Sequence, residues 1–357
     1  MPPVLRFLAR RLATIPITLL IVTAALYALL MLAPPQQRAQ LYLPPQLPSR
    51  LTEEDVQRLL DEIVRHQGLD DPYPVQYARW LLSLARGEWG YSPVQNQDVL
   101  AALVGRLPVT AELTLYSVAV FVPLGLLAGV HAARRTGQRY DGSFRFAAFL
   151  GTSLPPFALG FLLLSIFYVA LGWFPPWRLS LANDLFVRSM DFRTITGLLT
   201  IDGLLNGRPD ISADALRHLV LPVMTLSLSH WATLGRLTRA SVLEELEKAY
   251  VVSARARGLP DRQIVWRHAF HNALIPALNS TALSAASLVT GVFVVEVVFA
   301  FRGLSQLITA ATIYTPDIPM AVGFAVFSVL LVLPLMILLD LIQAAVDPRL
   351  REGISEL

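Results

Sequence analysis

Residues 249–276 read AYVVSARARGLPDRQIVWRHAFHNALIP, a polar connection between two apolar segments of the chain. Small residues at Ala254, Ala256 and Gly258 let another protein approach the backbone closely. Gly258 suits the end of a helix, and Pro260 prevents that helix from continuing. The pattern therefore predicts a helix, a break and a second helix, and the first helix has a surface small enough to fit a groove on a partner.

The segments on either side of this connection are apolar, as is much of the chain. Hydrophobic residues make up 54% of it and charged residues 15%, whereas about 25% of residues are charged in soluble proteins. A bilayer core of roughly 30 Å requires about 20 apolar residues of helix. Six segments fit this requirement: 12–33, 113–130, 146–173, 219–235, 273–295 and 318–339. The sequence predicts an all-α polytopic membrane protein with six transmembrane helices.

The first apolar segment could also be a cleaved signal peptide, since basic residues precede it. Its uncharged stretch covers 12–33, longer than the roughly 7–15 residues of a signal sequence. We therefore expect a retained helix.

Basic residues predict the orientation, because they are enriched in cytoplasmic loops. With the N-terminus in the cytoplasm, the inner segments hold 16 basic and 8 acidic residues, against 13 and 15 in the outer ones. Both termini are then cytoplasmic, and so is the loop 240–276.

The first outer segment, 34–108, has two stretches with helical spacing. Thr52 and Asp55 have the spacing of a capping box. Apolar residues then follow at helical intervals: Val56, Leu59, Leu60 and Ile63, and later Tyr77, Trp80, Leu81 and Leu84. Two amphipathic helices are predicted, which either pack within the protein or at the membrane interface, or else present a docking surface. The second outer segment, 174–217, is rich in Pro and Gly and is predicted to be an irregular loop.

Several kinds of chemistry are excluded by what the sequence lacks. Cysteine is absent, and the only lysine, Lys248, follows Glu247, so no phosphate-binding P-loop exists. His268 and His271 lack a third metal ligand at suitable spacing. We expect no catalytic residue, no metal and no cofactor on this chain, and no nucleic-acid partner. If ATP drives the protein, separate subunits must bind it.

Polar and small residues inside the apolar segments allow alternative interpretations. Glu112, Glu296 and Asp340 lie near segment ends, where they serve as polar anchors and ion-pair partners or contact a substrate. Ser280, Ser284, Ser287 and Gly291 fall on one helix face, which either lines a translocation path or packs against another helix. Gly125 and Gly129 form a GxxxG packing motif, and Pro155 with Pro156 predicts a kink.

The connection also resembles a known motif, the cytoplasmic coupling motif of ABC-importer permeases in its dipeptide and oligopeptide variant. The matching positions are Tyr250, Val251, Ala254, Arg255, Ala256, Gly258, Leu259, Arg267, His268, Ala269, Asn272, Ala273, Leu274, Ile275 and Pro276. Ser253 and Arg257 are conservative replacements. Ala249 and Val252 depart from the Asp and Arg usual there. Shorter matches at 87–92, 106–113, 295–304 and 347–349 extend the resemblance over nearly the whole chain.

The resemblance implies how the chain is organised and which residues serve which role. Residues 1–33 would form the N-terminus and first span, 34–108 an extracytoplasmic segment, 109–346 the permease core of five spans and 347–357 a cytoplasmic tail. The implied ATPase-coupling residues are Tyr250, Ala254, Arg255, Ala256, Arg257, Gly258 and Leu259, supported by Arg267, His268, Asn272 and Pro276. The candidate path residues, inferred from the polar helix face and the charges near segment ends and not from the resemblance, are Ser280, Ser284, Ser287 and Glu296.

The resemblance also implies an assembly in a prokaryotic plasma (inner) membrane. This chain would pair with a second, homologous permease, bind two cytoplasmic ATPases that hold ATP, and receive peptides from an extracytoplasmic binding protein. ATP-driven closure would switch the path by alternating access. Import of nickel chelates, oligosaccharides or another solute fits the same sequence, whereas a secondary transporter or a non-transporting scaffold fits it less well.

Overall fold

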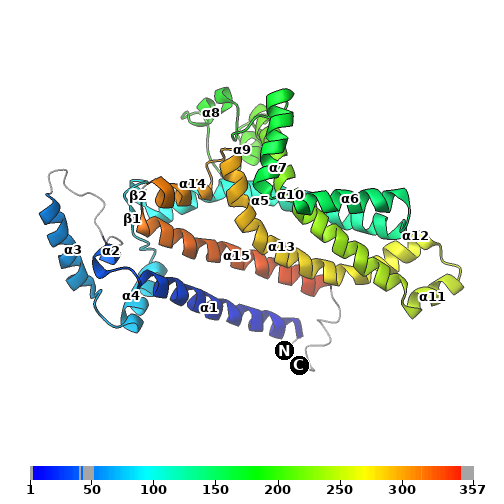
Figure 1. Cartoon of the computed structure of the whole chain (residues 1–357), viewed down its shortest axis with the longest axis horizontal. Helices are drawn as coiled ribbons and strands as arrows, with labels where there is room; N and C mark the ends of the chain where they lie inside the picture. Colours follow the sequence, from blue (N-terminus) through cyan, green and yellow to red (C-terminus); the bar gives the residue numbers. More distant parts are fainter. Residues whose placement is uncertain (1–2, 40–41, 43–51, 315, 347–357) are drawn as a thin grey trace. The chain divides into compact units, whose positions relative to one another are not determined.

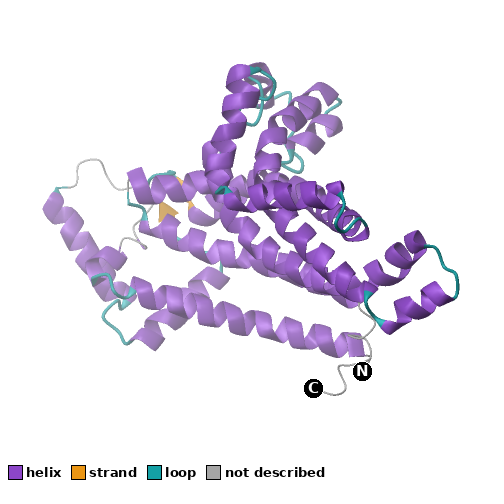
Figure 2. Ribbon diagram, turned by 45° about the vertical axis from the view of Figure 1, so that its right-hand side comes forward, coloured by secondary structure: helices purple, strands orange, loops and turns teal. Residues whose placement is uncertain are grey.

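The computed structural model describes residues 3–39, 42, 52–314 and 316–346, which are almost entirely helical (Figure 1). The only strands in these ranges are β1 (Tyr91–Ser92) and β2 (Gln97–Asp98), which pair antiparallel (Figure 2). Two compact units divide the chain. Residues 109–302 form most of the first unit, and residues 9–108 with 303–333 form the second.

The second unit contains the amphipathic helices predicted in the first outer segment. Its helical elements are α1 (Pro3–Leu30), α2 (Pro35–Ala39), α3 (Glu53–Gln67), α4 (Tyr73–Ala85), α14 (Leu304–Thr309), the π-helical η4 (Ala310–Tyr314) and the start of α15 (Ile318–Val346). The capping box of Thr52 and Asp55 is confirmed at the start of α3. Trp80 of α4 is buried against Tyr27 of α1, with ring centroids 5.0 Å apart. The apolar side of α4 is therefore packed within this unit.

The first unit is a bundle arranged around α10. Its elements are α5 (Val99–Arg134, from 109), α6 (Arg139–Ser153), α7 (Pro156–Leu163), η2 (Leu164–Ala170), α8 (Leu181–Val187), α9 (Leu199–Leu205), α10 (Pro209–Leu246), α11 (Ala249–Ala256), α12 (Asp261–Gln263), η3 (Ile264–Ala269) and α13 (Phe270–Val298). α10 packs along α6 and α13 (Figure 1). A Cβ on Gly129 would lie 2.5 Å from the carbonyl oxygen of Gly235, which confirms close helix packing at the GxxxG motif.

The kink predicted at Pro155 and Pro156 is confirmed, and it is a sharp bend. α6 and the α7–η2 helix meet at 106°, because proline breaks the helical hydrogen bonding and restricts the residue before it. The predicted segment 146–173 is therefore two helices with different directions.

Two described helices, α5 and α10, are each long and apolar enough to cross a membrane, and the bent pair makes a third if it counts as one span. The predicted first and sixth segments overlap the apolar helical stretches Pro16–Leu30 and Ile318–Val332. The fifth, 273–295, lies within α13. The number of six spans stays a prediction.

The prediction of an irregular loop over 174–217 is wrong. This segment holds α8, α9 and the first turns of α10. Its helices pack on a small apolar core of Leu179, Phe192, Leu199, Ile211 and Ala215, and carboxylates hold its turns. Asp202, fully buried, accepts hydrogen bonds from the backbone N–H groups of Thr196 and Gly197 at 2.8 and 2.9 Å. Asp214 of α10 accepts from the Ser180 hydroxyl at 2.7 Å and so holds the start of α8.

Glu112 joins this segment to α5. Its carboxylate accepts from Arg178 Nη2 at 2.6 Å and from the Thr200 backbone N–H at 2.9 Å, and its side chain is only 1% exposed. This geometry confirms the ion-pair interpretation of Glu112. Glu296, also fully buried, accepts from the Thr110 hydroxyl at 2.5 Å. The side chain of Asp340 lies outside the described residues.

Candidate functional site

The candidate site lies where the chain passes from α10 to α13, at the end of these two long helices (Figure 1). The sequence predicts a single break in this connection, but the structure has two. α10 ends at Leu246, and Lys248 has an extended backbone (φ −74°, ψ 149°), so α11 begins anew at Ala249. The helix that carries the predicted coupling residues is therefore the short α11, separate from α10.

The end of α11 follows the predicted glycine pattern. Gly258 has φ +78°, a backbone conformation that glycine adopts without strain. Its N–H donates to the Arg255 carbonyl at 2.9 Å, and the Leu259 N–H donates to the Ala254 carbonyl at 3.2 Å. This pair of bonds is the Schellman motif, which ends a helix and reverses the chain. Pro260 then begins the turn into α12.

One side of α11 is buried on a small apolar core. Val251, Ala254 and Ile264 are buried together, with Leu259 packed against them. Beyond Ile264, η3 packs through Val265 and other apolar residues against α10 and α5. Because η3 continues directly into α13, this core fixes α11 to the start of a long apolar helix.

A polar network supports the beginning of α11. The Tyr250 hydroxyl donates to Glu245 Oε2 at 2.6 Å and accepts from Asn272 Nδ2 at 3.2 Å. Lys248 Nζ donates to the other Glu245 oxygen at 2.5 Å. Burial, together with the hydrogen bond to Glu245, raises the pKa of the Tyr250 phenol. The phenol therefore stays protonated at neutral pH and continues to donate.

The opposite side of α11 is exposed and carries no charge. Ala249, Val252, Ser253 and Ala256 are all exposed, and their spacing places them on one helix face. Val252 is 60% exposed, although it is a β-branched apolar residue. The two departures from the usual motif, Ala249 and Val252, thus both lie on this face. We call these four residues the α11 face.

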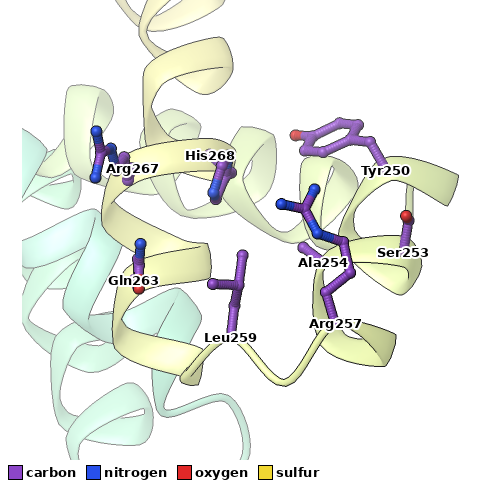
Figure 3. A pocket seen from close by; sticks show the side chains of 8 residues that line it. All are labelled: Tyr250, Ser253, Ala254, Arg257, Leu259, Gln263, Arg267 and His268. Carbon is purple, nitrogen blue, oxygen red and sulfur yellow. The ribbon is translucent and has the colours of Figure 1, made fainter.

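A groove of about 450 Å³ separates α11 from α12 and η3 (Figure 3). It is lined by Tyr250, Ser253, Ala254, Arg257, Leu259, Gln263, Arg267 and His268. Arg257 extends from the end of α11 into the space between Tyr250 and His268 (Figure 3). The neighbouring Arg255 lies outside the groove and is 3.7 Å from Asp261. We call this hollow the α11 groove.

The structure brings most of the predicted coupling residues together. Four of the seven, Tyr250, Ala254, Arg257 and Leu259, line the α11 groove together with the support residues Arg267 and His268, while Arg255, Ala256 and Gly258 lie outside it and are exposed. Asn272 joins the site through Tyr250. The side chain of Pro276 lies outside the described residues. Glu245 and Gln263 were missed, because no motif links them to residues that become neighbours only after folding.

The structure describes the side chains of only two of the four candidate path residues, Ser287 and Glu296. The side chains of Ser280 and Ser284 lie outside the described residues, and Ser287 is exposed. The burial of Glu296 beside Thr110 is the geometry of a polar anchor. A path along this face of α13 stays a prediction.

No group of three or more His, Asp or Glu residues is placed to hold a metal ion in the described part of the chain.

Comparison with known families defines the class of protein. Residues 122–352 match the family described as binding-protein-dependent transport system inner membrane component. Residues 4–114 match the N-terminal region of the same kind of membrane component. The protein is therefore a multi-pass inner-membrane transport permease and not an enzyme, and it works in a complex with an ATPase, which binds the ATP, and a binding protein.

Within that class, the chain belongs to the binding-protein-dependent transport system inner membrane component family. It is 32% identical to the di/tripeptide transport system permease protein DppB of Pseudomonas aeruginosa, over 97% of this chain and 99% of the relative. The oligopeptide transport system permease protein AppB of Bacillus subtilis is 30% identical over 81% of this chain and 84% of its own length. The dipeptide transport system permease protein DppB of Alkalihalophilus pseudofirmus is 29% identical over 84% and 88%.

Proposed function

We propose that this chain forms one half of the translocation path of an ATP-driven importer of di- and oligopeptides. The observation that carries the proposal is α11, whose uncharged face is exposed while its other side is fixed through η3 to α13. A helix with this construction is suited to sit in a groove of the ATPase and to pass its movement to the membrane helices. The path then opens alternately to the two sides of the membrane.

The assembly that follows has two permeases and two ATPases. A second, homologous permease supplies the other half of the path, and each permease offers one coupling helix to one ATPase. Both termini and α11 lie in the cytoplasm, in agreement with the excess of basic residues in the inner segments. The binding protein delivers its solute at the opposite face of the membrane, where residues 34–108 and α8–α9 lie.

Peptides are the proposed solute because the similar relatives are named for di-, tri- and oligopeptide transport. The test is uptake into vesicles that contain the complete importer, with a labelled dipeptide, a nickel chelate and an oligosaccharide as separate substrates. We expect ATP-dependent uptake of the dipeptide alone. Uptake of the nickel chelate or the oligosaccharide in preference to the peptide would reject the proposed substrate.

The coupling role is tested at Gly258. A Cβ here meets no atom within 4 Å, so an Ala side chain fits sterically, and any substitution costs about 1–2 kcal/mol for the left-handed backbone. Gly258→Ala and Gly258→Trp share this cost and differ in bulk, which makes Ala the matched control. We expect the Trp variant to fold and to hydrolyse ATP without importing peptide, whereas the Ala variant imports it. Normal uptake by the Trp variant would contradict the docking role.

A further inference from the structure

The α11 groove is lined by basic and neutral polar groups. Arg257, Arg267 and His268 contribute nitrogen donors, and Ser253 and Gln263 contribute neutral ones. No carboxylate is among the residues that line it. Of the acidic residues that lie close to the lining residues in the sequence, Asp261 is 3.7 Å from Arg255, and Glu245 accepts hydrogen bonds from Lys248 and Tyr250. The groove therefore carries a positive charge that the described part of the chain does not balance.

Arg257 differs from the other well-placed arginines of the same unit. Arg178 is paired with the buried Glu112, and Arg239 binds Asp141 through two nitrogens at 2.6 and 2.9 Å. The backbone N–H of Arg257 donates to the Ser253 carbonyl, but its guanidinium makes no hydrogen bond or ion pair with any described residue, although it extends between α11 and η3 (Figure 3). A guanidinium binds a carboxylate through two parallel hydrogen bonds, and that geometry is still available at Arg257.

The position of the groove identifies its occupant. Ser253 belongs both to the α11 face and to the lining of the groove, so the two surfaces are continuous. A protein that covers the α11 face must therefore extend to the edge of the groove. Charge complementarity then requires an acidic side chain on that protein where it meets Arg257.

We propose that the α11 groove receives an acidic side chain of the ATPase subunit, held by the guanidinium of Arg257. This rests on the proposed function, which makes the ATPase the protein that covers α11. The interface is then reciprocal. The permease inserts the uncharged α11 face into the ATPase, and the ATPase inserts a carboxylate into the permease.

The proposal is tested in the complete importer, purified with its ATPases from cells that express all subunits. Arg257→Glu reverses the charge in the groove, and Arg257→Gln removes it. Arg262→Glu is the matched control, because Arg262 is an exposed arginine of α12 that does not line the α11 groove and instead lines a neighbouring hollow with Pro260, Gln263 and Trp266. The readout is the amount of ATPase that stays bound to the permease between about 0.1 M and 1 M salt, where the Debye length falls from about 10 Å to about 3 Å.

We expect Arg257→Glu to weaken ATPase binding by about tenfold or more at low salt. Arg257→Gln should weaken it less and should make binding less sensitive to salt. Arg262→Glu should leave binding within about twofold of the wild type. One acidic-to-lysine change in the ATPase should restore binding to Arg257→Glu, and this rescue would identify the inserted side chain.

Equal effects of Arg257→Glu and Arg262→Glu, or no effect of either, would overturn the proposal.

An anionic lipid headgroup is the competing occupant of the α11 groove. If Arg257→Gln alters activity only in vesicles that contain phosphatidylglycerol and leaves ATPase binding unchanged, the lipid occupies the groove and the proposal is wrong. If Gly258→Trp uncouples transport while Arg257→Glu has no effect, only this inference is rejected. If neither variant has an effect, the proposed coupling function is rejected as well.

Discussion

Two connections of the first unit use their charged residues in opposite ways. In the segment from Arg178 to Asp214, Arg178 donates to the buried Glu112 of α5, and Asp202 and Asp214 accept hydrogen bonds from backbone and side chains of the same segment. In the α11 connection, Arg257 and Arg267 have no ionic partner among the described residues. The first connection is stabilised by its own charges, whereas the second pairs Lys248 with Glu245 and Arg255 with Asp261 but leaves the guanidinium groups of Arg257 and Arg267 without an ionic partner among the described residues.

This difference predicts which substitutions lower the stability of the protein and which alter its function. Substitutions in the Arg178–Asp214 segment should lower the stability of the permease, because they leave buried groups without partners. Substitutions on the α11 face should leave stability nearly unchanged and alter the interaction with the ATPase. Each of the following predictions tests one side of this contrast.

The largest effect on stability is expected at Glu112. Glu112→Ala leaves the guanidinium of Arg178 and the Thr200 N–H without their acceptor, which should cost about 3–5 kcal/mol. Thermal unfolding of the detergent-solubilised permease measures this loss. Glu112→Gln, of nearly the same shape, is the control and should lose less because it still accepts hydrogen bonds. If Glu112→Ala unfolded at the wild-type temperature, the ion pair would have no structural role.

A smaller and more local effect is expected at Asp202. Asp202→Ala removes the acceptor for the N–H groups of Thr196 and Gly197, which should cost about 2 kcal/mol. Hydrogen exchange should become faster at these amides and stay slow in the core of α10. Asp202→Asn keeps one oxygen acceptor and should fall between the wild type and Ala. Unchanged exchange at 195–197 in Asp202→Ala would show that the carboxylate does not order this turn.

The smallest effect on stability is expected at Val252. Because its side chain is 60% exposed, Val252→Asp should change stability by less than about 0.5 kcal/mol. It places a charge on the α11 face, so ATPase binding and ATP-driven peptide uptake should fall. Val252→Thr, which keeps the shape and adds no charge, should bind and transport normally. If Val252→Asp bound ATPase and imported peptide like the wild type, the α11 face would not be the contact surface.

The sequence by itself determined the features that depend on neighbouring residues. The capping box of Thr52 and Asp55, the turn at Gly258 and the break at Pro155 and Pro156 all follow from local backbone chemistry. The close packing at Gly125 and Gly129 follows from small residues one helical turn apart, as part of an apolar segment. The coupling residues were identified by an ordered motif that lies within one short connection.

Only the tertiary structure decided which charged groups meet. Glu112 lies 66 residues from Arg178 and 88 from Thr200, and no spacing rule predicts such pairs. For the same reason the helices of the segment 174–217 were missed, since their apolar core of Leu179, Phe192, Leu199, Ile211 and Ala215 and the hydrogen bonds of Asp202 and Asp214 join residues that are far apart in the sequence. The second break, at Lys248, and the placement of Arg257 beside η3 also depended on folding. Burial strengthens a paired charge and penalises an unpaired one, and burial is a property of the assembled chain.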